Sequence, residues 1–175
     1  AKDTPLSAKD RVTYGPALGA LQRWPEAADQ FAGITDRSIA GLAAYYRARA
    51  LLRAGQDASA IIALKNVVRL FPNDTAAAAT ALYLLADLAT DAGQMDSARS
   101  YYLRIAARYP TNSPRAHATL LAAIIAFNAG KPATTLRELT RALETASVPN
   151  EVHPSRHWPG RASWDSRGTS LRTME

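Results

Sequence analysis

The sequence has no cysteine and no long apolar run, and each absence excludes a class of protein. Without cysteine there is no disulfide framework, no thiol nucleophile and no thiolate metal ligand. No uninterrupted apolar stretch approaches the roughly 20 residues that a membrane-spanning helix needs, so we expect no transmembrane segment. Gly-rich phosphate loops and serine-nucleophile motifs are also missing, so we predict no cofactor and no catalytic residue.

Histidine is scarce, and its placement does not favour a metal site. His153 and His157 are four residues apart, a spacing that could hold a metal on a helix. Pro154 lies between them, however, and no carboxylate ligand is well placed. We therefore predict no metal centre.

The charge balance is positive and rests mainly on arginine. The chain carries 21 Lys and Arg against 15 Asp and Glu, a formal net charge of +6. A basic balance raises the question of nucleic acid. The arginines are spread along the chain and not clustered in sequence, so we do not expect nucleic-acid binding.

One pattern of residues recurs along the middle of the chain at intervals of 38 and 37 residues. The copies are Gly55, Ala60, Leu64 and Pro72, then Gly93, Ala98, Tyr102 and Pro110, and more weakly Gly130, Thr135 and Leu139. An internal period of this size predicts stacked helix pairs. We expect an all-α fold, a right-handed α-solenoid of about three to four antiparallel helix hairpins with irregular arms at both ends.

Turn and cap residues indicate where the helices end. Each hairpin glycine can take the left-handed conformation that ends a helix, and an alanine seven residues earlier (Ala48, Ala86 or Ala123) allows two helices to approach closely. We expect Asp57 and Asp96 to cap the helices after the glycines. The predicted helices span 25–33, 37–54, 58–71, 75–92, 97–109, 114–129 and 132–146, after a short or irregular helix over 13–22. The predicted domains are an extended arm over 1–12, a repeat domain over 13–148 and an irregular tail over 149–175.

The repeated residues resemble the tetratricopeptide repeat, although the usual period of that family is about 34 residues. The phrase RYPTNS at 108–113 is similar to bacterial cell-envelope repeat proteins, including the Tol-Pal-associated coordinator family and the outer-membrane assembly lipoproteins. Residues 75–145 also resemble the superhelical non-catalytic part of soluble lytic transglycosylases, and HWPGRA at 157–162 is faintly like a helix of those enzymes.

The resemblance implies a non-enzymatic protein–protein interaction scaffold. It also implies a periplasmic location, although a cytoplasmic one stays open. Our leading hypothesis is an extrinsic subunit, peripheral to the membrane, that binds other subunits of a membrane-attached complex. The alternative is the accessory domain of a cell-wall lytic enzyme, which would contact peptidoglycan without its catalytic module. That module would carry a glutamate followed by serine, and none of the five glutamates in this chain is followed by serine.

Residues equally distant from the hairpin glycines should lie side by side on the first helices, which line the concave side of such a stack. These sets are Tyr45, Tyr83 and Leu120 at ten before the glycine, Arg49, Asp87 and Ile124 at six before, and Arg53, Asp91 and Asn128 at two before. We expect Arg49 to pair with Asp87 and Arg53 with Asp91, each exposed pair contributing about 0–1 kcal/mol.

The same stripe is our candidate for partner binding. Tyrosine and arginine are enriched at protein interfaces, and Tyr45, Arg49, Arg53 and Tyr83 lie there together with both aspartates. The alternative for the tyrosines is packing between repeats. Asp87 and Asp91 are spaced for acid–base work, but the paired carboxylate of a glycosidase needs a second element that is not evident.

The ends of the chain leave two questions open. Trp158 and Trp164 lie in the tail, and since aromatic residues are depleted in disordered segments, we expect them to pack on the last hairpin or on a partner. The chain begins at Ala1 without methionine, which fits either signal-peptide cleavage or trimming.

Overall fold

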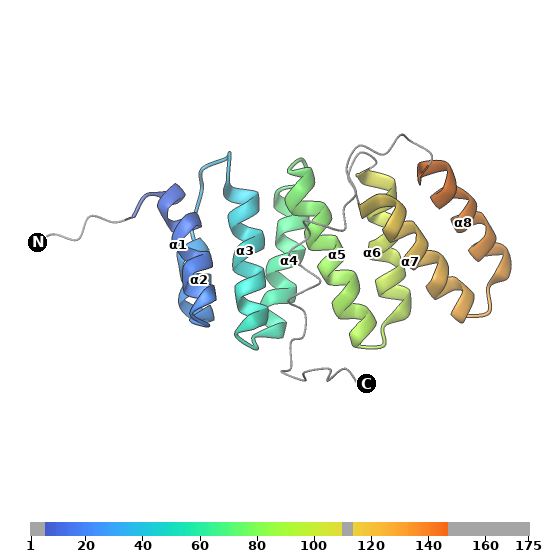
Figure 1. Ribbon diagram of the computed structural model, residues 1–175, viewed down its shortest axis with the longest axis horizontal. Coiled ribbons are helices and arrows are strands. Elements are labelled where there is room, and N and C mark those ends of the chain that lie inside the picture. Colours follow the sequence, from blue (N-terminus) through green and yellow to red (C-terminus); the bar gives the residue numbers. More distant parts are fainter. Residues whose placement is uncertain (1–5, 110–113, 147–175) are drawn as a thin grey trace, which may run out of the picture.

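A computed structural model describes residues 6–109 and 114–146, and eight helices form within these ranges. They stand side by side as four antiparallel hairpins in one row, from α1 at the N-terminal end to α8 (Figure 1). The helices are α1 Ala8–Ala20, α2 Trp24–Phe31, α3 Ala40–Arg53, α4 Asp57–Leu70, α5 Thr75–Asp91, α6 Met95–Arg108, α7 Pro114–Asn128 and α8 Pro132–Ala146. This confirms the all-α solenoid.

The turns inside the hairpins confirm the role predicted for the repeated glycines. Gly55, Gly93 and Gly130 have φ angles of +73°, +71° and +68°, in the left-handed region that glycine occupies without strain. The amide after each glycine donates back to the last turn of the preceding helix, as Gln94 does to the Ala89 carbonyl at 2.8 Å. This is the Schellman arrangement, and it satisfies carbonyls that a helix end leaves unpaired.

The opening hairpin uses the same turn without glycine. Gln22 has a φ of +59° and stands at the position of Gly55, one residue beyond the C-cap of the first helix. Seven residues earlier lies Gly15, where a Cβ would come within 2.2 Å of the Phe31 ring. The hairpin is therefore regular in architecture although its sequence lacks the repeated markers.

The small residues of the repeat lie where the helices meet. The repeated alanines lie seven residues before each glycine and five after the first two, and all of them are fully buried: Ala48, Ala86, Ala123, Ala60 and Ala98. Leu64 is also fully buried, and Tyr102 is 3% exposed. Alanine at these points allows close backbone approach, and the larger residue fills the space beside it. The packing prediction is confirmed.

Two predictions about helix starts are wrong. We expected an extended arm over residues 1–12, but α1 begins at Ala8, where the Ser7 hydroxyl accepts a hydrogen bond from the Asp10 amide at 3.2 Å. The side chains of Asp57 and Asp96 do not cap, because both residues lie inside the first helical turn. There they still face the positive end of the helix dipole.

Contacts between hairpins define two faces of the molecule. Each helix packs on the next one in sequence, and α3 also contacts α5. We call the side formed by α3, α5 and α7 the first-helix face, and the side formed by α4, α6 and α8 the second-helix face. Across the second-helix face, the Tyr109 hydroxyl donates to the Pro72 carbonyl at 3.3 Å, and Arg99 on α6 forms an ion pair with Glu138 on α8.

Candidate partner-binding faces

The predicted residues of α3 lie partly buried on the first-helix face. The Tyr45 ring lies 5.8 Å from that of Tyr46, and burial raises the pKa of the Tyr45 hydroxyl above its ordinary value, an effect that nearby Arg49 opposes. The Arg53 guanidinium lies over the Trp24 ring of the preceding hairpin, 5.8 Å from its centroid. Burial is the main reason that the pKa of Arg53 is lowered, with repulsion from Arg49 adding to it. These side chains are thus held by packing and are only partly accessible.

The predicted residues of α5 join three helices. The Tyr83 ring meets Tyr102 of α6 edge-on at 5.5 Å and stacks on His117 of α7 at 5.9 Å with an interplanar angle of 17°. The Tyr102 hydroxyl donates to an Asp87 carboxylate oxygen at 2.6 Å. Burial, reinforced by that carboxylate, raises the pKa of Tyr102 well above its ordinary value, so the hydroxyl remains a neutral donor.

The prediction that ion pairs connect neighbouring hairpins is wrong. Within the described residues, Arg49 does not pair with Asp87 and Arg53 does not pair with Asp91. Asp87 instead turns to Tyr102 of its own hairpin, and Arg53 contacts an aromatic ring. Since Asp87 has a structural partner in Tyr102, its spacing from Asp91 carries no support for acid–base chemistry.

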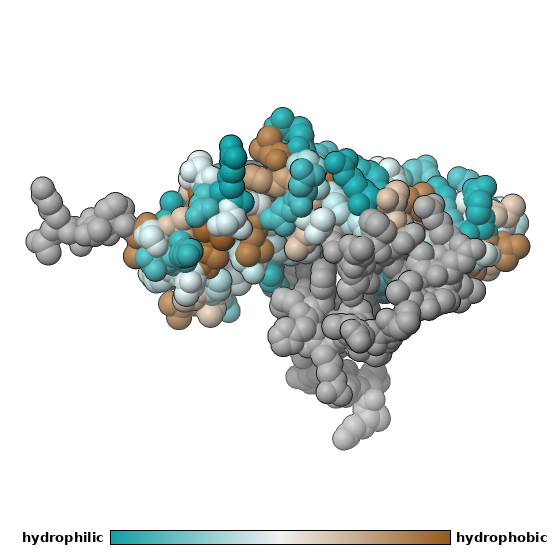
Figure 2. All heavy atoms as spheres, turned by 90° about the horizontal axis from the view of Figure 1, so that it is seen from above, coloured by the Kyte–Doolittle hydropathy of each residue, from teal (hydrophilic) through white to brown (hydrophobic). Residues whose placement is uncertain are grey.

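An apolar stripe on α7 continues this face. Leu120, Ile124 and Phe127 are 40%, 45% and 68% exposed, and their spacing places them on one side of the helix. Seen from above, the described surface carries a mixture of apolar and hydrophilic side chains (Figure 2). Sequence reasoning put Leu120 and Ile124 in line with Tyr83 and Asp87 but missed their exposure. The sequence did contain a signal for this exposure. The helix α7 is apolar on several sides, and a helix in a single row of hairpins cannot bury all of its sides.

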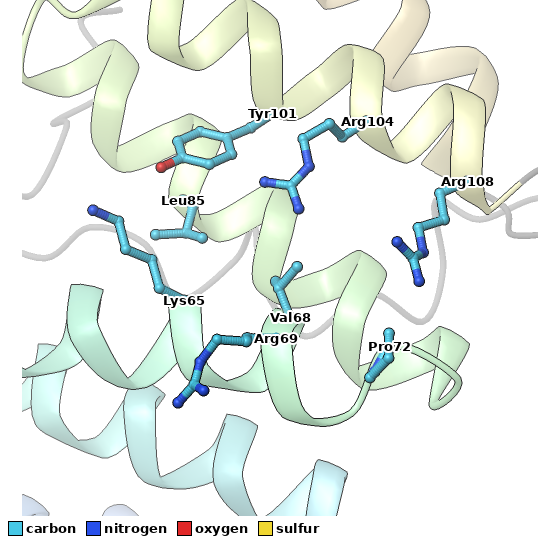
Figure 3. Close-up of a pocket in the computed structure, with 8 residues that line it drawn as sticks. All are labelled: Lys65, Val68, Arg69, Pro72, Leu85, Tyr101, Arg104 and Arg108. Atoms are coloured by element: carbon cyan, nitrogen blue, oxygen red, sulfur yellow. The ribbon is translucent and has the colours of Figure 1, made fainter.

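A groove on the second-helix face was not predicted. It has a volume of about 460 Å³ and lies between α4 and α6, with α5 beneath it (Figure 3). Its lining residues are Lys65, Val68, Arg69, Pro72, Leu85, Tyr101, Arg104 and Arg108. The described residues of this lining thus provide four cations, no carboxylate, and a floor of apolar side chains.

Some predictions fall outside what the structure describes. Pro110, Trp158 and Trp164 lie outside the described residues, so they stay predictions. Among the residues that are described, no group of histidine and carboxylate side chains could hold a metal ion. In the same ranges, no helix combines the length and apolarity required to cross a membrane.

The sequence matches a family described as Tetratricopeptide repeat over residues 14–75 and 63–113. The chain belongs to this family, whose repeats make it a protein–protein interaction scaffold. A solved structure described as "Crystal structure of MamA" is similar, with 17% sequence identity, a TM-score of 0.60, and coverage of 83% of this chain and 81% of that one. At this identity the similarity shows the shared fold. No curated protein matches the chain.

Proposed function

We propose that this scaffold is a non-enzymatic, extrinsic subunit of a larger membrane-attached assembly on the periplasmic side, and that it holds a protein partner on its first-helix face. Family membership supports the scaffold, and the resemblance of residues 108–113 to cell-envelope repeat proteins supports the location. The comparisons do not favour the alternative of an accessory domain of a lytic enzyme.

The observation that carries the partner site is the exposed α7 stripe beside the aromatic cluster of α5. Fully burying a side chain of this size contributes about 1.5–3 kcal/mol relative to full exposure. Leu120, Ile124 and Phe127 still expose 40%, 45% and 68% of their surface, so each can supply part of that energy and together they form an apolar anchor. Next to them, Tyr83 and His117 offer stacked rings that are already held in place. Rigid aromatic groups at the edge of an apolar patch are typical of interface hot spots.

Co-purification from detergent-solubilised membranes tests this proposal. We would compare the full chain with a variant carrying Ile124→Asp and Phe127→Asp. The matched control carries Ile62→Asp and Leu70→Asp on α4, where the native side chains are 62% and 56% exposed. We expect the wild type and the control to capture the same membrane proteins, identified by mass spectrometry. Capture by the α7 variant should fall at least about tenfold.

Three outcomes would contradict the proposal. Equal capture by all three proteins would mean that the first-helix face is not the partner site. Failure of the wild type to enrich any membrane protein would contradict the role in a membrane-attached assembly. Retention on purified peptidoglycan in place of membrane proteins would instead support the cell-wall alternative.

Osmotic-shock fractionation tests the location, because a periplasmic subunit is released with the periplasmic fraction.

A further inference from the structure

The groove between α4 and α6 is formed by a regular feature of the stack. Second helices of successive hairpins are spread apart, and the first helix between them, α5, packs against both. Lys65 and Arg69 are four residues apart on α4, and Tyr101, Arg104 and Arg108 follow one side of α6. The cations of two hairpins therefore meet across one opening (Figure 3).

The four cations of the groove form no ion pair with any residue that the structure describes. Arg69 donates a hydrogen bond to the Asn66 side-chain oxygen at 3.1 Å, which leaves its charge unbalanced. In the described part of the chain, Lys65, Arg104 and Arg108 form no ion pair. Like charges gathered around one opening repel, and this repulsion is relieved when an anion enters. Arginine is also suited to carboxylates, which it can bind through two parallel hydrogen bonds.

The floor of the groove narrows the class of anion. Val68, Leu85 and Pro72 lie between the two cationic rims with the ring of Tyr101, so a fitting ligand carries an apolar group between negative charges. Inorganic phosphate would leave this floor unused. Nucleic acid is usually held by an extended track with several stacking rings, whereas Tyr101 is the one aromatic side chain among the described residues that line this groove. A flat membrane surface does not match a recess.

The dimensions suit a short stretch of polypeptide. Lys65 and Arg69 are four residues apart, about 6 Å along the helix, and Tyr101 and Arg108 are seven apart, about 10 Å. An extended chain advances about 3.3 Å per residue, so about three or four residues would lie in the groove. A second copy of this chain is a poor occupant, because the net charge of +6 makes two copies repel.

We propose that the groove between α4 and α6 binds an acidic segment of a partner protein, in which carboxylates flank an apolar side chain. This second interaction surface lies on the face opposite the α7 stripe and does not depend on the function proposed for that stripe. Lys65, Arg69, Arg104 and Arg108 bind the carboxylates. Val68, Leu85 and the Tyr101 ring receive the apolar side chain.

The test is a fluorescence-anisotropy titration of the full chain with a labelled peptide, Gly-Asp-Glu-Leu-Glu-Asp-Gly. Two control peptides separate the contributions: one replaces the acids by their amides, and the other replaces leucine by glycine. We expect the amide peptide to lose binding and the glycine peptide to bind about tenfold more weakly. Affinity for the acidic peptide should fall between about 0.05 and 0.5 M salt, because exposed charges are screened.

Two charge-reversal variants test whether the peptide binds in the groove. The test variant carries Arg104→Glu and Arg108→Glu, and the control carries Arg37→Glu and Arg47→Glu, which are exposed and lie outside the groove. Both change the net charge equally. The test variant should bind the acidic peptide at least about tenfold more weakly, and the control within about twofold of wild type. Circular dichroism checks that each variant keeps its helix content.

Several results would overturn the proposal. One is equal weakening by the two variants, which would indicate non-specific attraction to a basic protein. Another is equal binding of the leucine and glycine peptides, because the apolar floor would then play no part. A third is binding of inorganic phosphate, oligothymidine or phosphatidylglycerol vesicles that needs Arg104 and Arg108 while the peptide does not bind. That result would assign the groove to another class of anion.

Discussion

The first-helix face and the α4–α6 groove come from the same repeats but differ in how their polar groups are satisfied. On the first-helix face, Asp87 accepts a hydrogen bond from Tyr102 and Arg53 lies over Trp24. The exposed apolar side chains of that face form the stripe on α7. In the groove the apolar side chains form the floor, and the exposed groups are cations that form no ion pair within the described ranges.

An arginine's role in this stack therefore depends on its place between hairpins. Arg99, Arg104 and Arg108 all lie on α6. Arg99 meets Glu138 of the next hairpin and stabilises the stack, whereas the other two face the preceding hairpin, where cations stand opposite them. One helix serves both stability and recognition, and substitutions can separate the two roles.

The largest effect should come from the paired arginine. Glu138→Ala removes a carboxylate that is almost fully buried and leaves Arg99 without its partner, so we expect about 3 kcal/mol of destabilisation. Arg104→Ala, on the same helix but unpaired, should change the free energy of unfolding by no more than about 0.5 kcal/mol. Urea unfolding followed by circular dichroism measures both. Similar losses in the two variants would contradict the division of roles.

A smaller loss should follow when the first-helix face loses its internal hydrogen bond. Tyr102→Phe removes the donor to the Asp87 carboxylate in a partly buried place, so we expect about 1.5–2 kcal/mol of destabilisation. Tyr101→Phe is the matched control, since the neighbouring tyrosine lines the groove. Its effect should be near zero. If the control were as damaging as Tyr102→Phe, the hydrogen bond to Asp87 would not be the cause.

The same tyrosine predicts a pH dependence. The pKa of Tyr102 is raised in the folded state, so the folded protein holds this proton more tightly than the unfolded chain does. The stability it contributes is complete below its ordinary pKa of 10.0 and is lost as the pH rises above that value. Urea unfolding at a series of alkaline pH values should show a steeper decline for wild type than for Tyr102→Phe. Identical slopes would mean that this hydroxyl does not titrate differently on folding.

The smallest effect is expected where an ion pair was predicted and did not form. A double-mutant cycle of Arg53→Gln and Asp91→Asn should give a coupling energy below about 0.3 kcal/mol, because the structure does not pair these side chains. The measurement is again urea unfolding of the two single variants and the double variant. A coupling energy of about 1 kcal/mol would instead show that an ion pair connects the two hairpins.

Most of the fold could be predicted because its rules are local. Gly55 and Gly93 end helices through their left-handed backbone, and Ala60 and Ala98 lie where helices meet. The opening hairpin was harder to predict, because Gln22 takes the left-handed turn without the glycine that would mark it. The start of α1 was missed because its signal is a single cap at Ser7, with weak apolar periodicity behind it.

The candidate sites were predictable only in part. Counting back from the hairpin glycines correctly assigned Tyr83 and Asp87 to the first-helix face. This count fixes backbone positions but not side-chain directions, so the ion pairs predicted for Arg49 and Arg53 were wrong. The groove escaped prediction for another reason. Its cations come from two helices far apart in sequence, so charges that look scattered along the chain gather only when the hairpins stack.

A crossed binding experiment tests whether the scaffold has two separate interaction surfaces of different chemistry. The acidic peptide titration and the membrane-protein capture are both run on the α7 variant with Ile124→Asp and Phe127→Asp, and on the groove variant with Arg104→Glu and Arg108→Glu. We predict that the α7 variant keeps peptide binding and loses capture. The groove variant should lose peptide binding and keep capture. Loss of both activities in both variants, with helix content intact, would contradict the existence of two independent surfaces.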